Sequence, residues 1–207
     1  MHIGIIGTGN VGEALARAFA RAGHSVTLGS RHPQARADGL GETTPPGAAA
    51  RADVVILALP WSAAEPAIRA LGDLQGKIVI DCMNPLGPTP QGLGLTIGHT
   101  TSGGEIVAGW LPKARVVKTL NTVGAEVMDS ARALPHPPAM LMAGEDDRAK
   151  ATVATLLQDI GFDPLDAGGI VQARYLEPFA MVWINQAIFR GKGRDWAFAA
   201  VTRGPTP

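Results

Sequence analysis

The stretch His2-Ile3-Gly4-Ile5-Ile6-Gly7-Thr8-Gly9-Asn10-Val11-Gly12 decides the fold of this chain. Its first half is an apolar run typical of a buried strand, and its second half carries glycines in the spacing Gly-x-Gly-x-x-Gly. An amphipathic segment, residues 13–22, follows at once and predicts a helix. Strand, tight turn and helix in this order make the glycine pattern a dinucleotide-binding fingerprint. The sequence therefore predicts an α/β fold, a doubly wound Rossmann-type parallel sheet.

Each glycine of this pattern has a physical task in a dinucleotide site. Gly7 lets the chain turn sharply, Gly9 lets a pyrophosphate approach the backbone, and Gly12 lets the helix pack closely against the strand. The phosphates would then meet free N–H groups at the positive end of the helix. The alternative is that the glycines only shape a turn. The candidate cofactor-binding residues of this stretch are Gly7, Thr8, Gly9, Asn10, Val11 and Gly12.

The end of the second expected strand, residues 25–29, indicates which dinucleotide binds. Sites for NAD usually place an acidic residue there, which binds the ribose 2′-hydroxyl. This chain has Ser30 and Arg31 instead, and residues 14–37 contain no carboxylate. A hydroxyl and a guanidinium can bind a 2′-phosphate that a carboxylate would repel, and Arg36 could add positive charge. We therefore expect NADP(H), the alternative being that Arg31 is a solvated surface charge.

The composition of the 207 residues excludes several classes of protein. The formal net charge is zero, which argues against nucleic acid or an anionic membrane as the main partner. Cys82 is the single cysteine, so no internal disulfide can form, and no apolar run approaches the length of a membrane span. No segment has the pattern of a secretory signal, so we expect a cytoplasmic protein with small-molecule partners.

Apolar runs alternate with amphipathic segments along the rest of the chain, as in a parallel sheet. The expected strands are residues 54–60, 77–82, 115–120 and 139–144, with a short edge strand at 163–168. The expected helices are residues 61–71, 102–111, 122–133 and 146–160. Residues 84–100 are rich in glycine and proline and predict a loop, with 88–98 as its mobile part.

The chain divides into two expected parts. Residues 1–168 would form an NADP-binding Rossmann-like domain, and residues 169–207 a C-terminal helical extension. Apolar positions of the tail, around Leu176, Phe179 and Trp183, recur at helical spacing through about residue 200. This apolar face must pack against something, which would be the sheet, the site or a second subunit. We therefore expect a homodimer.

Ligands of open α/β sheets bind at the carboxyl ends of the strands. The residues just past these ends complete the candidate cofactor site: Leu59, Pro60, Trp61, Asn84, Pro85 and Asn121. The prolines would leave backbone carbonyls free for the nicotinamide, and the asparagines could bond an amide or a ribose unless they only form turns. Trp61 could stack on a ligand ring or anchor its own helix. Lys118 could be an edge charge or a cation of the site.

Some catalytic patterns are missing from the chain. It contains no His, Cys and carboxylate cluster with metal-ligand spacing, no Gly-x-Ser-x-Gly elbow and no Tyr-x-x-x-Lys pair. We therefore predict no metal site and assign no catalytic residue. A reductase of a small carbonyl or imine would need a proton donor, and His99 and Tyr175 are the candidates. A third hypothesis is a non-catalytic NADP(H)-sensing module, which would bind the nucleotide without turnover.

Taken together, the motifs resemble the NADPH-dependent reductases of the deazaflavin coenzyme F-420 (also written F420). The resemblance covers nearly the whole chain and rests on Ile-Ile-Gly-Thr-Gly-Asn-Val-Gly at 5–12, Gly-Ser-Arg at 29–31, Leu-Pro-Trp at 59–61, Val-Val-Lys-Thr-Leu-Asn-Thr at 116–122 and Pro-Leu-Asp-Ala-Gly at 164–168. A similar domain occurs in membrane metalloreductases of the STEAP type, which use a flavin. The resemblance implies hydride transfer between NADPH and a deazaflavin or flavin, which needs stacking and alignment rather than an acid or a base.

The resemblance also implies roles for single residues. The 2′-phosphate end would be held by Thr8, Ser30 and Arg31. The nicotinamide side would be bordered by Leu59, Pro60 and Asn84. The chain departs from the archaeal members at residues 121–124, where it has Asn-Thr-Val-Gly in place of His-Thr-Ile-Pro. The archaeal members have a further lysine for the 2′-phosphate. It aligns with Ala35 of this chain, one position before Arg36.

Overall fold

A computed structural model describes residues 1–203, so the last residues of the expected C-terminal extension, 204–207, lie outside the described part. The main sheet has eight strands in the order β10-β9-β8-β5-β4-β1-β2-β3. These strands are β1 (His2–Ile6), β2 (Ser25–Gly29), β3 (Gly41–Thr43), β4 (Val54–Leu57), β5 (Ile78–Asp81), β8 (Arg115–Lys118), β9 (Ala139–Gly144) and β10 (Asp163–Asp166). Six of them run parallel, while β9 pairs antiparallel with β8 and parallel with β10. The predicted Rossmann-type fold is confirmed, except that β9 and β10, at one edge of the sheet, run antiparallel to the other strands.

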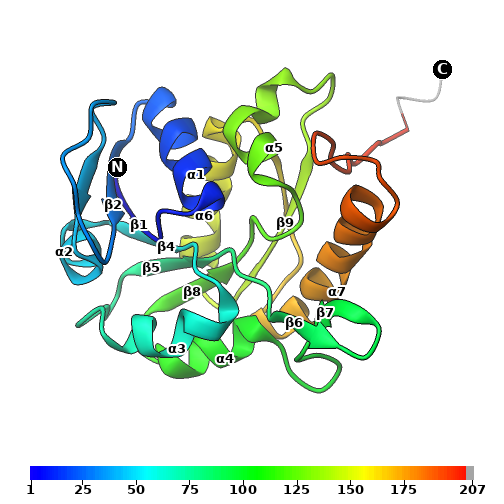
Figure 1. Ribbon diagram of the computed structural model, residues 1–207, viewed down its shortest axis with the longest axis horizontal. Coiled ribbons are helices and arrows are strands. Elements are labelled where there is room, and N and C mark those ends of the chain that lie inside the picture. Colours follow the sequence, from blue (N-terminus) through cyan, green and yellow to red (C-terminus); the bar gives the residue numbers. More distant parts are fainter. Residues whose placement is uncertain (204–207) are drawn as a thin grey trace.

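Helices cover both faces of the sheet, as Figure 1 shows. One face carries α1 (Asn10–Arg21), α5 (Ala125–Ser130) and α6 (Asp147–Asp159). The other face carries α2 (Pro45–Arg51), α3 (Trp61–Arg69) and α4 (Gly103–Trp110). The last long helix, α7 (Ala173–Ile184), lies at the β9 end of the molecule, beside the second, two-stranded sheet. This arrangement is the doubly wound architecture predicted from the alternating pattern.

The apolar runs of the central strands are buried because both faces are covered. Ile5 and Ile56 belong to the apolar cluster under α1, and Val55 and Val79 belong to the cluster under α3. All four side chains are fully buried. Successive side chains of a strand point to opposite faces, so a strand between two helix layers must be apolar at every position.

Two helices begin at residues whose side chains cap them. The hydroxyl of Ser102 accepts a hydrogen bond from the backbone N–H of Glu105 at 3.1 Å, at the start of α4. The carboxylate of Asp146 accepts one from the N–H of Ala149 at 2.7 Å, at the start of α6. Such caps satisfy N–H groups that have no partner within the helix. The side chain of Asp146 thus fixes where the last helix of the sheet layer starts.

The segment expected as a loop, residues 84–100, instead contains an antiparallel hairpin. Strands β6 (Leu86–Thr89) and β7 (Gly92–Leu95) pair with each other, and Leu86 lies opposite Leu95. Glycine and proline weaken a central strand but are tolerated in a short ribbon with free edges, so composition alone misled the prediction. The segment after β2 also holds a third strand and α2, which no pattern in the sequence predicted.

The C-terminal tail is less helical than its spacing predicted. Helix α7 ends at Ile184, a π-helical turn spans Asn185–Phe189, and residues 190–203 contain no helix. Gly191 and Gly193 have φ of +71° and +81°, a conformation that ends a helix. The expected helix at 122–133 is likewise reduced to α5 and a 3₁₀ turn. Within residues 1–203, none of the helices combines the length and apolar character that crossing a bilayer requires.

Candidate functional site

The turn between β1 and α1 forms the first part of the site. At Gly7 the backbone has φ of +118°, and an added Cβ atom would lie 2.2 Å from the carbonyl oxygen of Ala58. At Gly12 an added Cβ atom would lie 2.0 Å from the carbonyl oxygen of Gly7. Both positions therefore require glycine, one for the turn and the other for close packing of helix on strand. The sequence predicted these two tasks.

The space over Gly9 is open. A Cβ atom added there would meet no heavy atom within 4 Å. Gly9 is also the N-cap of α1, and no side chain caps the N–H groups of the first turn. The helix therefore presents unpaired N–H groups and the positive end of its dipole to this space. This cradle fits the pyrophosphate of a dinucleotide, which needs both features.

A cavity of about 540 Å³ lies beside the turn, where β1 and β2 end. Thr8 and Ser30 line it, so the structure brings together two predicted residues from different strands. Arg31 follows Ser30 with an exposed side chain, but it is not among the residues that line this cavity. Within residues 1–203 it forms no ion pair. The structure therefore brings the two hydroxyls together, and phosphate binding by Arg31 stays a prediction.

Arg36 lines the same cavity, but its charge is already balanced. Nη1 and Nη2 each donate to one carboxylate oxygen of Glu13 at 2.8 Å, and Nη1 also donates to Glu42 at 3.2 Å. Nε and Nη2 donate to Asp38 at 3.0 and 2.5 Å. The bonds to Asp38 and then to Glu13 raise the pKa of Arg36 above its ordinary value. The unbalanced positive charge expected here is therefore absent, and phosphate binding by Arg36 stays a prediction.

Sequence reasoning missed Glu42 and Asp38 as parts of this cavity. Glu42 reaches it because β3 pairs with β2, placing Glu42 opposite Leu28. A three-residue strand carries too little periodicity to be predicted from its own sequence. The position of Glu42 in the cavity therefore depends on the pairing of β2 with β3, which no local motif predicts.

Asn84 and Asn121 meet where β5 and β8 end. The Asn84 Nδ2 group donates to the Asn121 carbonyl oxygen at 2.8 Å, and Asn121 Nδ2 donates to Asn84 Oδ1 at 3.0 Å. Asn121 Nδ2 also donates to the carbonyl oxygen of Leu176 in α7 at 3.0 Å. Asn121 Oδ1 is buried and accepts no hydrogen bond from residues 1–203. Such an oxygen suits a ligand that carries a donor, because an unpaired buried acceptor costs free energy.

The two prolines of the predicted set are not equivalent. The Pro85 carbonyl oxygen accepts bonds from the N–H and the hydroxyl of Thr96, at 2.9 and 3.0 Å. The Pro60 carbonyl oxygen accepts one bond, from the N–H of Ala63 at 3.0 Å, and Pro60 is exposed beside the half-buried Leu59. The prediction that both carbonyls are free is therefore wrong for Pro85. Pro60 retains one acceptor position.

Trp61 begins α3 and packs against another tryptophan. Its ring stacks on that of Trp110 in α4, with centroids 5.6 Å apart and planes 20° from parallel. Its ring also lies 3.3 Å from where a Cβ atom on Gly103 would be. These contacts favour the interpretation of Trp61 as the anchor of its helix. A direct contact between Trp61 and a ligand stays a prediction.

The sequence suggested that Lys118 is an edge charge or a cation of the site, and the structure supports neither. Its side chain is fully buried, and Nζ lies 3.1 Å from Asp81 Oδ2 and 3.0 Å from Glu177 Oε1. Burial alone would lower the pKa of Lys118, but the charges of Asp81 and Glu177 outweigh it and raise the pKa above its ordinary value. Glu177 also accepts bonds at 2.9 Å from the N–H groups of Gly103 and Gly104. This cluster ties α7 to the sheet and to the start of α4.

Cys82 follows Asp81 in a dry environment. The thiol donates to the Leu57 carbonyl oxygen at 2.9 Å. Burial raises the pKa of Cys82 to about 12. Because the thiolate is the nucleophilic form, this cysteine is not a candidate for covalent catalysis.

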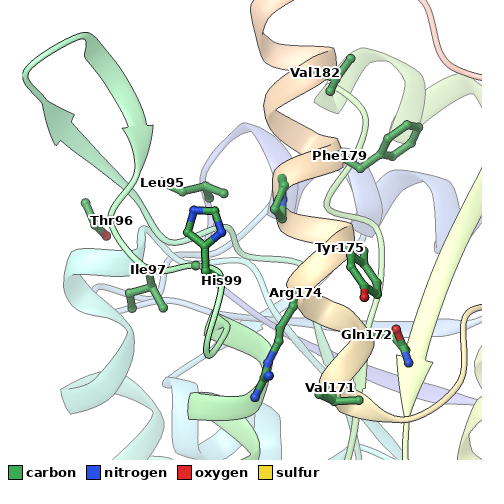
Figure 2. Close-up of a pocket in the computed structure, with 12 residues that line it drawn as sticks. Leu95, Thr96, Ile97, His99, Val171, Gln172, Arg174, Tyr175, Phe179 and Val182 are labelled. Atoms are coloured by element: carbon green, nitrogen blue, oxygen red, sulfur yellow. The ribbon is translucent and has the colours of Figure 1, made fainter.

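A groove of about 940 Å³ lies between α7 and the segment that follows β7. Figure 2 shows Leu95, Ile97 and His99 on one side of it, with the residues of α7 on the other. Both walls are tied to the asparagine pair. Thr96 is bonded to Pro85, next to Asn84, and Leu176 is bonded to Asn121. His99 and Tyr175, the proton donors considered from the sequence, both line this groove.

Comparisons with known proteins agree with this geometry. The family model described as "NADP oxidoreductase coenzyme F420-dependent" matches residues 2–85. A crystal structure from Arthrobacter sp. FB24, of a protein with the provisional name F420-dependent NADP-reductase, is 35% identical. The match covers 97% of this chain and 99% of that chain, with a TM-score of 0.88.

Two curated relatives are also similar. The F420-dependent NADP reductase of Methanothermobacter thermautotrophicus is 29% identical over 206 residues, which cover 89% of this chain and 88% of the relative. Metalloreductase STEAP3 of Rattus norvegicus is 30% identical over 179 residues, or 84% of this chain. The match spans only 35% of the length of STEAP3.

Proposed function

The chain belongs to the family of coenzyme F420-dependent NADP oxidoreductases, and on this premise we propose that it transfers a hydride between NADPH and a deazaflavin such as coenzyme F420, or a related flavin. The family is one of NADP-dependent oxidoreductases, so the chain is an enzyme of this class. The observation that carries the proposal is the open, uncapped start of α1 beside the cavity that Thr8 and Ser30 line. NADPH supplies the hydride when it is bound.

The residues of the first turn bind the phosphates in this proposal. The pyrophosphate lies over Gly9 and takes the N–H groups at the start of α1. Thr8, Ser30 and Arg31 take the 2′-phosphate, because hydroxyls donate to it and the guanidinium neutralises part of its charge. The backbone around Asn10, Val11 and Gly12 forms the floor under the cofactor.

At the other end, the strand ends of β4, β5 and β8 orient the nicotinamide. Leu59 and Pro60 form an apolar edge, and the Pro60 carbonyl has an acceptor position left. Asn84 and the unpaired oxygen of Asn121 accept hydrogen bonds from the carboxamide. In this proposal Trp61 and Pro85 support the site from behind through their packing and hydrogen bonds.

The acceptor lies in the groove beside α7. Its walls carry apolar side chains, among them Leu95, Val171 and Phe179, that suit a flat aromatic ring. Both walls are bonded to the residues around Asn84 and Asn121, so an acceptor there would lie next to the nicotinamide side. Hydride transfer between two stacked rings depends on their alignment and requires neither an acid nor a base.

The proposed reaction is tested by following NADPH oxidation with coenzyme F420, FMN and FAD as acceptors, side by side. Turnover with the deazaflavin, and slower turnover with the two flavins, is expected. Faster turnover with FMN or FAD would move the assignment to a flavin reductase. NADPH binding without turnover on any of the three acceptors would contradict the proposal and favour a different acceptor.

A reductase of a small carbonyl or imine is the second candidate, because His99 and Tyr175 line the same groove. In that case a proton must be delivered, so His99→Gln or Tyr175→Phe should lower kcat by about 100-fold or more. In the proposed deazaflavin reaction neither substitution should change kcat by more than about threefold. The same two variants therefore discriminate the two functions.

We also propose that residues 169–207 act as an extension through which two copies associate. Within the described part of that tail, Ile188 and Phe189, which do not line the groove, are 49% and 53% exposed. Exposed apolar side chains in the continuation of a helix favour a protein contact. Light scattering at micromolar concentration should give twice the mass of the chain, and a monomer would reject the homodimer.

A further inference from the structure

The guanidinium of Arg36 has no donor left for an incoming anion. An arginine side chain offers five N–H donors, and all five donate here, to Glu13, Asp38 and Glu42. Arg36 therefore lies among three carboxylates on the wall of the cavity beside the glycine turn, and Arg17 approaches one of them, Glu13, at 4.0 Å from outside. The cavity that should receive a 2′-phosphate is thus acidic at this wall.

The three partners of Arg36 differ in how firmly they are held. Glu13 lies in the first turn of α1 and Glu42 lies in β3, so both belong to regular structure. Their side chains are 25% and 8% exposed, whereas Asp38 is 45% exposed and lies in the segment between β2 and β3. Ion pairs in contact with solvent contribute little to stability. Asp38 is therefore the partner that can leave Arg36 at the lowest cost.

The edge of Arg36 that Asp38 occupies is one that a phosphate can use. Asp38 takes Nε and one N–H of Nη2, a two-point geometry that carboxylates and phosphates share. Asp38, Arg36 and Ser30 all line the same cavity. A carboxylate in this position competes with a phosphate for the same donors and also repels it through space.

We propose that Asp38 is a specificity-determining residue: its carboxylate occupies the Nε–Nη2 edge of Arg36 and must be displaced when the 2′-phosphate of NADP(H) binds. The inference rests on the cofactor part of the proposed function. Asp38 weakens NADP(H) binding and leaves NAD(H) binding unchanged, because a ribose 2′-hydroxyl has no need of Arg36. The N–H of Leu40 donates to Asp38 Oδ1 at 3.2 Å, so the same carboxylate shapes the segment in the free protein.

The test compares the dissociation constants of NADP⁺ and NAD⁺ by isothermal titration calorimetry for the full chain and for Asp38→Asn. Asparagine keeps an oxygen for the Leu40 N–H and removes the negative charge. We expect NADP⁺ to bind about three to ten times more tightly to Asp38→Asn, with NAD⁺ affinity within about a factor of two of the wild type.

Two further variants separate competition for Arg36 from a general change of charge. Asp129→Asn removes one negative charge from a carboxylate that pairs with Arg17 and Arg21, away from the cavity, and should leave both affinities unchanged. Arg36→Met removes the shared partner. Introducing Asp38→Asn into Arg36→Met should give a smaller gain than in the wild type, because the competition for Arg36 is gone and only the repulsion through space is relieved.

An unchanged or weaker NADP⁺ affinity in Asp38→Asn, at the wild-type melting temperature, overturns the proposal. An equal gain for NAD⁺, or the same gain in Asp129→Asn, also overturns it. Binding requires no acceptor, so a wild type that binds NADP⁺ but reduces neither a deazaflavin nor a flavin contradicts only the proposed reaction. Failure of every variant to bind NADP⁺ would contradict both.

Discussion

Two cations of this molecule are held by carboxylates in opposite ways. Lys118 lies between Asp81 and Glu177, and none of these three side chains is more than 1% exposed. Arg36 lies among three carboxylates at the wall of a cavity, and one of them, Asp38, is 45% exposed. Both clusters pair one positive charge with more than one negative charge. They differ in whether water, or a ligand, can enter.

This difference separates an ion cluster that holds the fold together from one that a ligand can rearrange. The Lys118 cluster joins the ends of β5 and β8 to α7, and every partner lies within the core. A buried pair is hard to break, because the charge left behind has neither water nor a partner. The Arg36 cluster has a solvated partner, so a different anion can take its place at little cost. Exposure of the partner, more than the number of bonds, decides which role a cation takes.

The largest effect on stability is expected for Lys118→Met. The substitution leaves Asp81 and Glu177 buried without their shared partner, so it should lower the free energy of unfolding by about 3–5 kcal/mol. Urea unfolding followed by circular dichroism measures this loss. A loss below about 1 kcal/mol would mean that the cluster is not closed to water, and the contrast with Arg36 would disappear.

The next largest effect is expected on cofactor binding. Arg31 has no internal partner within residues 1–203, so Arg31→Ala should remove a charged contact to the 2′-phosphate and nothing else. The substitution should weaken NADP(H) binding by about 1.5–3 kcal/mol and leave NAD(H) binding almost unchanged. Titration calorimetry with both nucleotides gives the two values. An equal loss for both would reject the assignment of the 2′-phosphate to this residue.

A smaller effect on stability is expected for Arg36→Met, the counterpart of Lys118→Met. The carboxylates it leaves behind can be hydrated through the cavity, so the loss should be about 1 kcal/mol or less. The same urea experiment measures it. A loss as large as that of Lys118→Met would show that the Arg36 cluster is structural, which would also speak against displacement of Asp38.

The smallest effect is a dependence of stability on acid. The bond from Arg36 lowers the pKa of Asp38, and bonds from Arg36 and Ser30 lower the pKa of Glu42 although burial alone would raise it. Carboxyls with lowered pKa values stabilise the fold above their ordinary values of 3.8 and 4.5, and this contribution is lost as the pH falls through the values in the folded protein. Between about pH 6 and about pH 3, the melting temperature of the wild type should therefore fall more steeply than that of Arg36→Met. The same dependence of the melting temperature on pH in both proteins would show that the Arg36 cluster contributes nothing to stability.

The sequence predicted the parts of the fold that depend on local patterns. The glycine turn, the buried central strands and the helix start at Asp146 follow from spacing, apolar runs and capping chemistry, and the structure has them. The hairpin of β6 and β7 was missed because its glycines and prolines resemble a loop. The reversed direction of β9 was missed because a strand's own residues do not state the direction of its neighbour.

The positions of several candidate site residues could be predicted in the same way, but their long-range contacts could not. Position past a strand end placed Thr8, Ser30 and Asn121, whose contacts lie where that rule predicts. The partners of Lys118 and Arg36 could not be predicted. Glu177 reaches Lys118 from a helix far along the chain, and Glu42 reaches Arg36 through a three-residue strand. Such charge pairings depend on tertiary contacts that no local pattern encodes.

The stacked tryptophan pair of α3 and α4 has a counterpart between α7 and the residues after it. The two pairs provide intrinsic spectroscopic signals. All four tryptophans of the sequence are in stacked pairs: Trp61 with Trp110 at 5.6 Å, and Trp183 with Trp196 at 5.9 Å. Indole rings this close couple their strong far-ultraviolet transitions, so each pair should give a pair of circular dichroism bands of opposite sign that vanishes when its rings separate. One pair reports on the packing of α3 against α4, and the other on the attachment of residues 190–203 to α7. These two contacts could thus be followed separately, without a label.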